Sequence, residues 1–134
     1  MLTTHATDLE SGALITATRD RLRVRHSAHA IMNETMTETI KKVVHDITGA
    51  EEIVLFGSRA RGDSRSDSDY DILAVVPHPL DPRERLRLSS NCRLHLAKMG
   101  IDADVLVKSP DEIRDYCDKR GSIVHEALSS GIPL

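Results

Sequence analysis

The sequence predicts an α/β domain in which a small β-sheet is flanked by helices. Amphipathic segments that begin with helix-capping residues alternate with short, almost wholly apolar segments, which are typical of buried strands. Such an alternation favours a sheet covered by helices. With 134 residues, 40% of them hydrophobic and 29% charged, the chain has the balance of one folded domain. We expect this domain over residues 35–134, after an N-terminal extension over residues 1–34.

The N-terminal extension has no sustained helical period. Residues 21–25 alternate arginine with an apolar residue, which predicts a short edge strand. Because Met32 and Met36 lie close to the start of the first helix, we interpret residues 1–31 either as the result of an upstream start codon or as a mobile arm. Acidic residues dilute the arginines, which weighs against a targeting segment or a docking segment for an acidic partner.

The first helix is expected to begin at Thr35 and to end at Gly49. Residues 35–38 read Thr-Met-Thr-Glu, the form of a capping box, in which the threonine and the glutamate cap the first turn. Glycine commonly ends a helix because it adopts the left-handed conformation. The apolar residues after the box recur at helical spacing, on one face: Ile40, Val43, Val44 and Ile47.

Three apolar runs predict the strands of the sheet. Residues 53–56 form a short run that is bounded by glutamates and by Gly57. Residues 70–76 form a second run, which Pro77 ends because proline cannot donate to a β-ladder. Residues 101–107 form the third.

Three further helices are predicted from caps and apolar spacing. Asp81 caps the second helix, which has proline at its first position and runs to Gly100. Its apolar stripe consists of Leu88, Cys92, Leu96 and Met99. Ser109 and Glu112 cap the third helix, and the fourth precedes Gly131. The apolar residues of the fourth are Ile123, Val124, Ala127 and Leu128.

Charge and cysteine content narrow the class of function. The formal net charge of −3 leaves no overall positive field to attract nucleic acid, so a nucleic-acid partner is not expected. Cys92 and Cys117 match neither a disulfide framework nor a zinc site, which favours a reducing cytoplasm. The chain has neither a membrane-spanning apolar run nor the apolar core of a secretory signal, so we expect no membrane anchor and no export.

The loop after the first predicted strand has features of a phosphate-binding turn. Gly57 lacks a Cβ atom, so backbone N–H groups can approach a bulky anion, and Ser58 adds a hydroxyl donor. If residues 58–61 open a short helix, its free N–H groups point at the same place. Taken alone, a Gly-Ser pair more often marks an ordinary strand-to-helix turn. The loop also carries cations that are able either to neutralise a triphosphate or simply to be solvated: Arg59, Arg61 and Arg65.

Paired aspartates at the start of the second predicted strand are candidate metal ligands. Asp69 and Asp71 are two residues apart, so they project from one face of a strand. Uncompensated carboxylates suit Mg²⁺, and two such ions can clamp the attacking and leaving oxygens of a phosphoryl transfer. A lone Asp-x-Asp is more often a solvated acidic loop. A calcium-binding loop is excluded because its sixth position is Ile72 and its twelfth is His78.

The third predicted strand supplies another carboxylate to this set. Asp102 and Asp104 stand where an apolar strand begins, and an acidic residue there needs a partner. We favour Asp104 as the third metal ligand because it directly precedes the apolar run. The seven histidines show no convincing metal-ligand spacing.

These motifs together resemble the minimal nucleotidyltransferase family of the DNA polymerase beta superfamily. The resemblance rests on Gly57-Ser58, Gly62, the Asp69-Tyr70-Asp71 segment and Asp104, and it covers about residues 36–134. It implies a small mixed sheet, two Mg²⁺ ions held by Asp69, Asp71 and Asp104, and a nucleoside triphosphate such as ATP. It also implies that Asp104 acts on the acceptor hydroxyl. Relatives continue into a last short strand after Gly131, where this sequence ends at Leu134, so we expect that edge of the sheet to be incomplete.

The resemblance further implies a protein acceptor. Stand-alone domains of this kind resemble antitoxins that pair with a HEPN-type toxin and transfer AMP to one of its tyrosines, in a hetero-oligomer. Two alternatives stay open. One is transfer to a small molecule of the aminoglycoside type, across a homodimer, and the other is a non-catalytic module that neutralises a toxin by binding alone.

Overall fold

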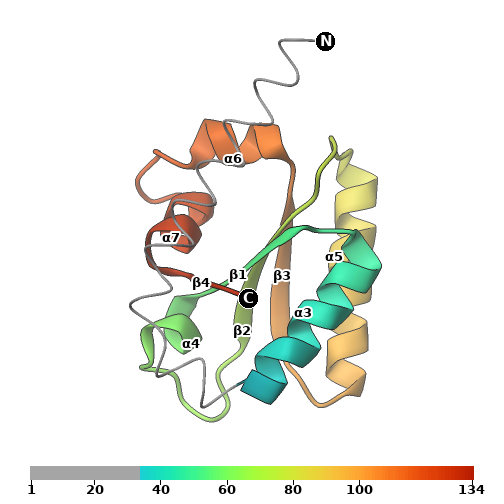
Figure 1. Cartoon of the computed structure of the whole chain (residues 1–134), viewed down its shortest axis with the longest axis vertical. Coiled ribbons are helices and arrows are strands. Elements are labelled where there is room, and N and C mark those ends of the chain that lie inside the picture. The colour runs from blue at the N-terminus through green and yellow to red at the C-terminus, as the bar shows by residue number, and fades with distance from the viewer. Residues whose placement is uncertain (1–33) are drawn as a thin grey trace.

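The computed structural model describes residues 34–134, and the extension, with its predicted strand over residues 21–25, lies outside the described residues. Within that part, the predicted α/β class with a mixed sheet is confirmed (Figure 1). None of the helices described there has both the length and the apolar character needed to cross a bilayer.

The sheet has the strand order β3-β2-β1-β4. It consists of β1 (Glu52–Phe56), β2 (Tyr70–Val75), β3 (Ala103–Lys108) and β4 (Ile132–Pro133). Strands β1 and β2 are antiparallel, β2 and β3 are parallel, and β4 runs antiparallel to β1. The two-residue β4 occupies the edge that was expected to be incomplete.

Helices cover both faces of this sheet (Figure 1). On one face lie α3 (Glu34–Thr48) and α5 (Pro82–Lys98), and on the other lie α6 (Pro110–Tyr116) and α7 (Ile123–Ser130). Helix α4 (Gly57–Arg61) follows β1 directly, and its buried Ala60 belongs to the core of the first face. Because side chains alternate along a strand, β1 sends Ile53 and Leu55 to the first face and Val54 and Phe56 to the second. The sheet therefore separates two hydrophobic cores.

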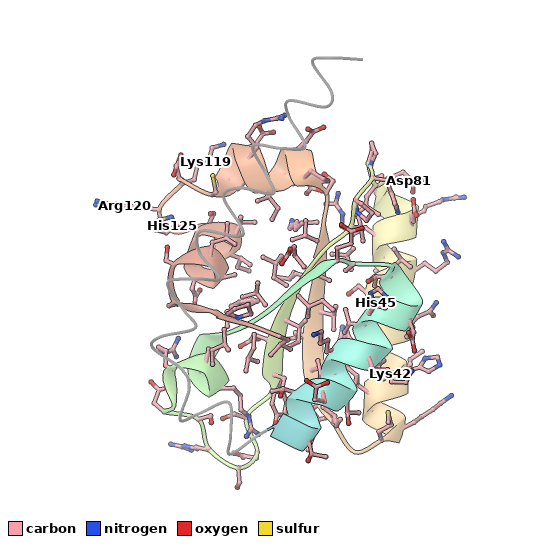
Figure 2. All side chains as sticks on the ribbon, viewed as in Figure 1. Lys42, His45, Asp81, Lys119, Arg120 and His125 are labelled. Atoms are coloured by element: carbon pink, nitrogen blue, oxygen red, sulfur yellow. The ribbon has the colours of Figure 1, made fainter. Side chains whose placement is uncertain are left out.

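Local capping chemistry explains where the helices begin. The Asp81 carboxylate accepts a hydrogen bond from the Glu84 backbone N–H at 2.8 Å, and Figure 2 shows Asp81 at the start of α5. Ser109 and Glu112 form the predicted capping box of α6. The capping box predicted at Thr35 is wrong, because α3 begins at Glu34 and Thr35 lies inside the helix.

The predicted stripe of α5 is correct for three of its four residues. Leu88, Cys92 and Leu96 are buried against the sheet, and burial raises the pKa of the Cys92 thiol to about 11. Met99 was predicted to join them and does not, because it caps the helix end and is 56% exposed. The remaining face of α5 is exposed to solvent.

Candidate active site

Three strand ends meet at one end of the sheet and bring the candidate residues together. In the parallel β2–β3 pair, Asp71 is the Cα partner of Asp104, and in the antiparallel β1–β2 pair Asp71 is the partner of Phe56. Neighbouring strands are about 4.8 Å apart. Asp71 and Asp104 therefore project from the same face of adjacent strands, with Gly57 beside them at the end of β1.

Asp71 lies in a field of negative charge. Burial raises its pKa above the ordinary 3.8, the charges of Asp104, Asp69 and Glu126 raise it further, and Arg61 lowers it. Asp69 precedes β2, which begins at Tyr70, so Asp69 reaches this cluster from the loop rather than from the strand. The site consequently holds more carboxylate charge than its own cations compensate.

Oxygen donors with excess negative charge are the donor chemistry that Mg²⁺ prefers. The acidic cluster around Asp71 thus fits a divalent cation. Its carboxylates are not gathered into a finished cage, because no three potential ligands among residues 34–134 lie within metal-binding range of one another. The Arg93 side chain from α5 lies 3.6 Å, Nε to Oδ1, from Asp104.

Asp102 takes a different position from Asp104. It precedes β3, is exposed, and accepts the Tyr70 backbone N–H at its carbonyl oxygen at 2.9 Å. Only Asp104 is aligned with Asp71 and contributes to the raised pKa of that residue. The geometry favours Asp104 as the third carboxylate.

Gly57 is required by its backbone and by its neighbour. Its φ of 73° lies in the left-handed region, which side chains disfavour. A Cβ atom there would lie 2.3 Å from Oδ2 of Asp71. The absence of a side chain at Gly57 therefore lets the Asp71 carboxylate pack directly against the turn, where α4 begins.

The short helix α4 presents the loop's first polar groups. Ser58 is half-buried in its first turn, and no side chain caps the helix at Phe56. The Ser58 carbonyl accepts the N–H groups of Gly62 and Asp63, which closes the turn at its other end. The uncapped N–H groups at the start of α4 lie next to Asp71.

The three predicted loop arginines have three different surroundings. The Arg59 guanidinium donates to the carbonyls of Ser66 and Ser68, at 2.7 Å to the latter, and stacks over the Tyr70 ring with its Cζ 4.4 Å from the centroid. Arg59 thus holds the acidic loop in place. Arg61 lies 3.3 Å from Asp63 and 3.6 Å from Glu126.

Arg65 is exposed in the middle of the loop, and its backbone N–H donates to Ser68 Oγ at 2.8 Å. Of the three arginines, Arg61 is the one whose charge lowers the pKa of Asp71. Of these cations, it is therefore the one that the structure places electrostatically within the site.

Sequence patterns missed two site residues, Arg93 and Glu126. Arg93 comes from α5 and Glu126 from α7, far along the chain from the aspartates. Neither stands in a motif, so only their position in the fold identifies them. Beside Arg93, α5 and β3 enclose a pocket of about 460 Å³. Its polar lining is Asp69, Ser90, Arg93, Asp102 and Asp104.

Comparisons with solved structures agree with this fold. A chain from a crystal structure of a toxin–antitoxin pair with AMP-PNP is 23% identical, with a TM-score of 0.50 over 72% of this chain and 69% of that one. Two further structures match with lower TM-scores. They are a Sulfolobus solfataricus nucleotidyltransferase described as putative (26% identity, 66% and 81% covered, TM-score 0.46) and a complex of tri-AMPylated Shewanella oneidensis HEPN toxin with MNT antitoxin (21%, 72% and 66%, 0.42).

No curated protein matches the chain at a significant level. A family model described as a nucleotidyltransferase domain matches residues 37–129. That span is well over half of the chain and contains the Gly57 turn and all three aspartates of the predicted motif. The chain therefore belongs to the nucleotidyltransferase domain family and is a nucleotidyltransferase.

Proposed function

We propose that the chain is a Mg²⁺-dependent enzyme that transfers AMP from ATP to a tyrosine hydroxyl of a HEPN-type toxin and so acts as its antitoxin. The observation that carries the proposal is the alignment of Asp71 with Asp104 beside the Gly57 turn. This arrangement supports phosphoryl transfer, which needs carboxylates that hold metal ions close to a phosphate-binding turn.

In the proposed reaction, the uncapped N–H groups of α4 and Ser58 bind the triphosphate, and Arg61 adds positive charge. The tyrosine oxygen bonds to the α-phosphorus, the bond from that phosphorus to the oxygen bridging to the β-phosphorus breaks, and pyrophosphate leaves with the electron pair. The phenolic proton passes to the Asp104 carboxylate. Asp69, Asp71 and Asp104 would hold Mg²⁺ ions, which stabilise the charge that develops on the phosphoryl oxygens.

The toxin partner is supported by likeness of fold. The structure with the TM-score of 0.50 is a toxin–antitoxin pair with AMP-PNP, which combines a protein partner with an ATP analogue. The two thiols of the described chain, Cys92 and Cys117, are free, which suits the reducing cytoplasm in which we propose the pair acts.

The test measures AMP transfer and neutralisation separately. Purified protein is incubated with Mg²⁺, α-labelled ATP and a purified HEPN-type toxin, and label on a tyrosine is the expected result. Asp69→Asn/Asp71→Asn should abolish both labelling and rescue of toxin-arrested cells, while Asp67→Asn, in the same loop, should leave both intact.

Two outcomes contradict the proposal. Rescue by Asp69→Asn/Asp71→Asn without any labelling would identify a non-catalytic toxin-binding module. Labelling of an aminoglycoside, with none on the protein, would identify a small-molecule enzyme.

A further inference from the structure

The pocket between α5 and β3 is chemically unlike the Gly57 turn. Three carboxylates line it, those of Asp69, Asp102 and Asp104, against the single cation Arg93. Its apolar lining includes Leu94, Ala97 and Ile101, a surface that suits an aromatic ring. The pocket therefore offers a site for an aromatic group whose polar end is directed at Asp104.

The position of the pocket agrees with the geometry of the proposed transfer. Attacking and leaving oxygens lie roughly in line, on opposite sides of the phosphorus. The Gly57 turn is at the end of β1, Asp71 is on β2, and Asp104 is on β3, so these groups form a row across the sheet. With pyrophosphate at the β1 end of the row, the acceptor has to enter at the β3 end. The pocket opens there, beside Asp104.

An exposed surface of α5 continues from this pocket. Leu86, Ser90, Arg93, Leu94 and Ala97 recur at spacings of three and four residues, so they share one helical face, which we call the α5 ridge. Leu86 is 69% and Leu94 is 60% exposed, unlike the buried leucines of the opposite face. Three residues of the ridge besides Arg93 line the pocket: Ser90, Leu94 and Ala97.

The charges around the α5 ridge specify what it would bind. Arg83, Arg87 and Lys98 are exposed on α5 in addition to Arg93, and the helix has one acidic residue, Glu84. Exposed leucines flanked by cations are complementary to a polypeptide segment with apolar side chains flanked by acidic ones.

We propose that the α5 ridge is the acceptor-docking surface, which binds a polypeptide segment whose tyrosine lies between apolar and acidic residues. The tyrosine ring enters the pocket against Leu94, Ala97 and Ile101, and its hydroxyl reaches Asp104. This proposal rests on the proposed function, because it assigns the acceptor of the same reaction. Arg93 is then a positioning residue, which exchanges its contact with Asp104 for an acidic group of the acceptor.

The test locates peptide binding without turnover. Full-length, ¹⁵N-labelled protein saturated with Mg²⁺ and α,β-methylene-ATP, whose α–β bridge cannot be cleaved, is titrated with two peptides that share a Leu-Tyr-Leu core, one flanked by aspartates and one by lysines. The acidic peptide should shift the amide signals of the α5 ridge and of Ile101 and should bind more tightly than the lysine peptide. Peptide shifts confined to other surfaces, or equal affinity for both peptides, would overturn the proposal.

Matched variants separate this proposal from the proposed function. Leu94→Glu should weaken the acidic peptide roughly tenfold, because it places charge in the centre of an apolar contact, and should leave α,β-methylene-ATP binding unchanged. Ile123→Glu, at another exposed apolar position, on α7, should change neither. Unchanged peptide affinity in Leu94→Glu would contradict the docking role of the α5 ridge and would leave the proposed function standing. Absence of α,β-methylene-ATP shifts at Gly57 and Ser58 in the wild type contradicts the proposed function, and the acceptor role of the ridge with it.

Discussion

At the residue scale, the ionised Asp71 carboxylate lowers the stability of the folded state while it supplies negative charge to the candidate site. Its pKa in the folded chain is raised above 3.8, first by burial and then by Asp104, Asp69 and Glu126. The folded state therefore holds the proton to higher pH than the unfolded state does. Stability falls as the pH rises through the interval between 3.8 and the raised pKa, and it stays lower above that interval.

We expect Asp71→Asn to raise the melting temperature at pH 7 in the absence of divalent cations. The gain should vanish below pH 3.8, where the carboxyl is protonated in both states. Mg²⁺ should stabilise the wild type more than the variant, since the cation relieves the repulsion. Thermal denaturation across pH checks this, with Asp67→Asn as the matched loop variant. Equal melting temperatures for wild type and Asp71→Asn at pH 7 would contradict the prediction.

Gly57 provides a second residue-scale prediction, with Gly49 as its control. Both have a positive φ, 73° and 72°, so alanine at either costs about 1–2 kcal/mol of stability. A Cβ at Gly49 meets nothing within 4 Å, whereas at Gly57 it collides with the Asp71 carboxylate. Gly57→Ala should therefore lose more stability than Gly49→Ala and, unlike it, should lose Mg-ATP binding. Calorimetry measures both effects, and equal losses in the two variants would refute the collision.

At the element scale, α7 acts on the site through one ion pair. Glu126 on α7 lies 3.6 Å from Arg61 on α4, and both side chains are about half exposed, so the pair itself contributes little to stability. Its effect is electrostatic, because Glu126 raises the pKa of Asp71 while Arg61 lowers it. The second face of the sheet thus influences the acidic cluster.

We expect Glu126→Gln to lower the pKa of Asp71. The substitution removes a negative charge and leaves Arg61 with Asp63 as its remaining carboxylate partner, and both changes favour ionised Asp71. Carboxyl ¹³C chemical shifts measured across pH follow this residue directly. Glu38→Gln on α3 is the control of equal charge change, and a pKa that moves equally in both variants would argue against a local effect of α7.

Elements were predictable from the sequence wherever their signals are local. The caps at Asp81 and Ser109 and the apolar period of α5 depend on neighbours in the chain, and the structure confirms them. Strand β4 forms by pairing with β1, and a strand of two residues is too short to give a recognisable pattern in the sequence. Met99 was misplaced because its helix ends just before it, and helix ends are poorly marked by hydrophobic period.

The residues of the candidate site were likewise predictable only where their signal is local in the sequence. Asp69 and Asp71 stand together in one segment, and apolar strands predicted Asp104 as a candidate beside them. Their alignment across β2 and β3 is a property of strand register, which requires the assembled sheet. Arg93 and Glu126 reach the cluster from separate helices and carried no signal.

At the scale of the whole molecule, the sheet divides the protein into a structural side and a reactive end. Two cores pack on its faces, which leaves the strand ends that carry Gly57, Asp71 and Asp104 outside the densest packing. Charge can therefore accumulate at that end without being buried in either core. The strands hold the acidic residues at fixed spacing. The surrounding helices expose different side chains to solvent.

Helix α5 has a buried face and an exposed face, so a residue on the buried face can report on what happens at the exposed one. Cys92 is fully buried against the sheet, and its thiol, with a pKa of about 11, stays protonated and unreactive at neutral pH. An alkylating reagent reaches it only when α5 lifts away, so its rate of modification reports how often the helix opens. A polypeptide bound to the outer face of α5 should slow that opening. The rate at which Cys92 is alkylated should then fall.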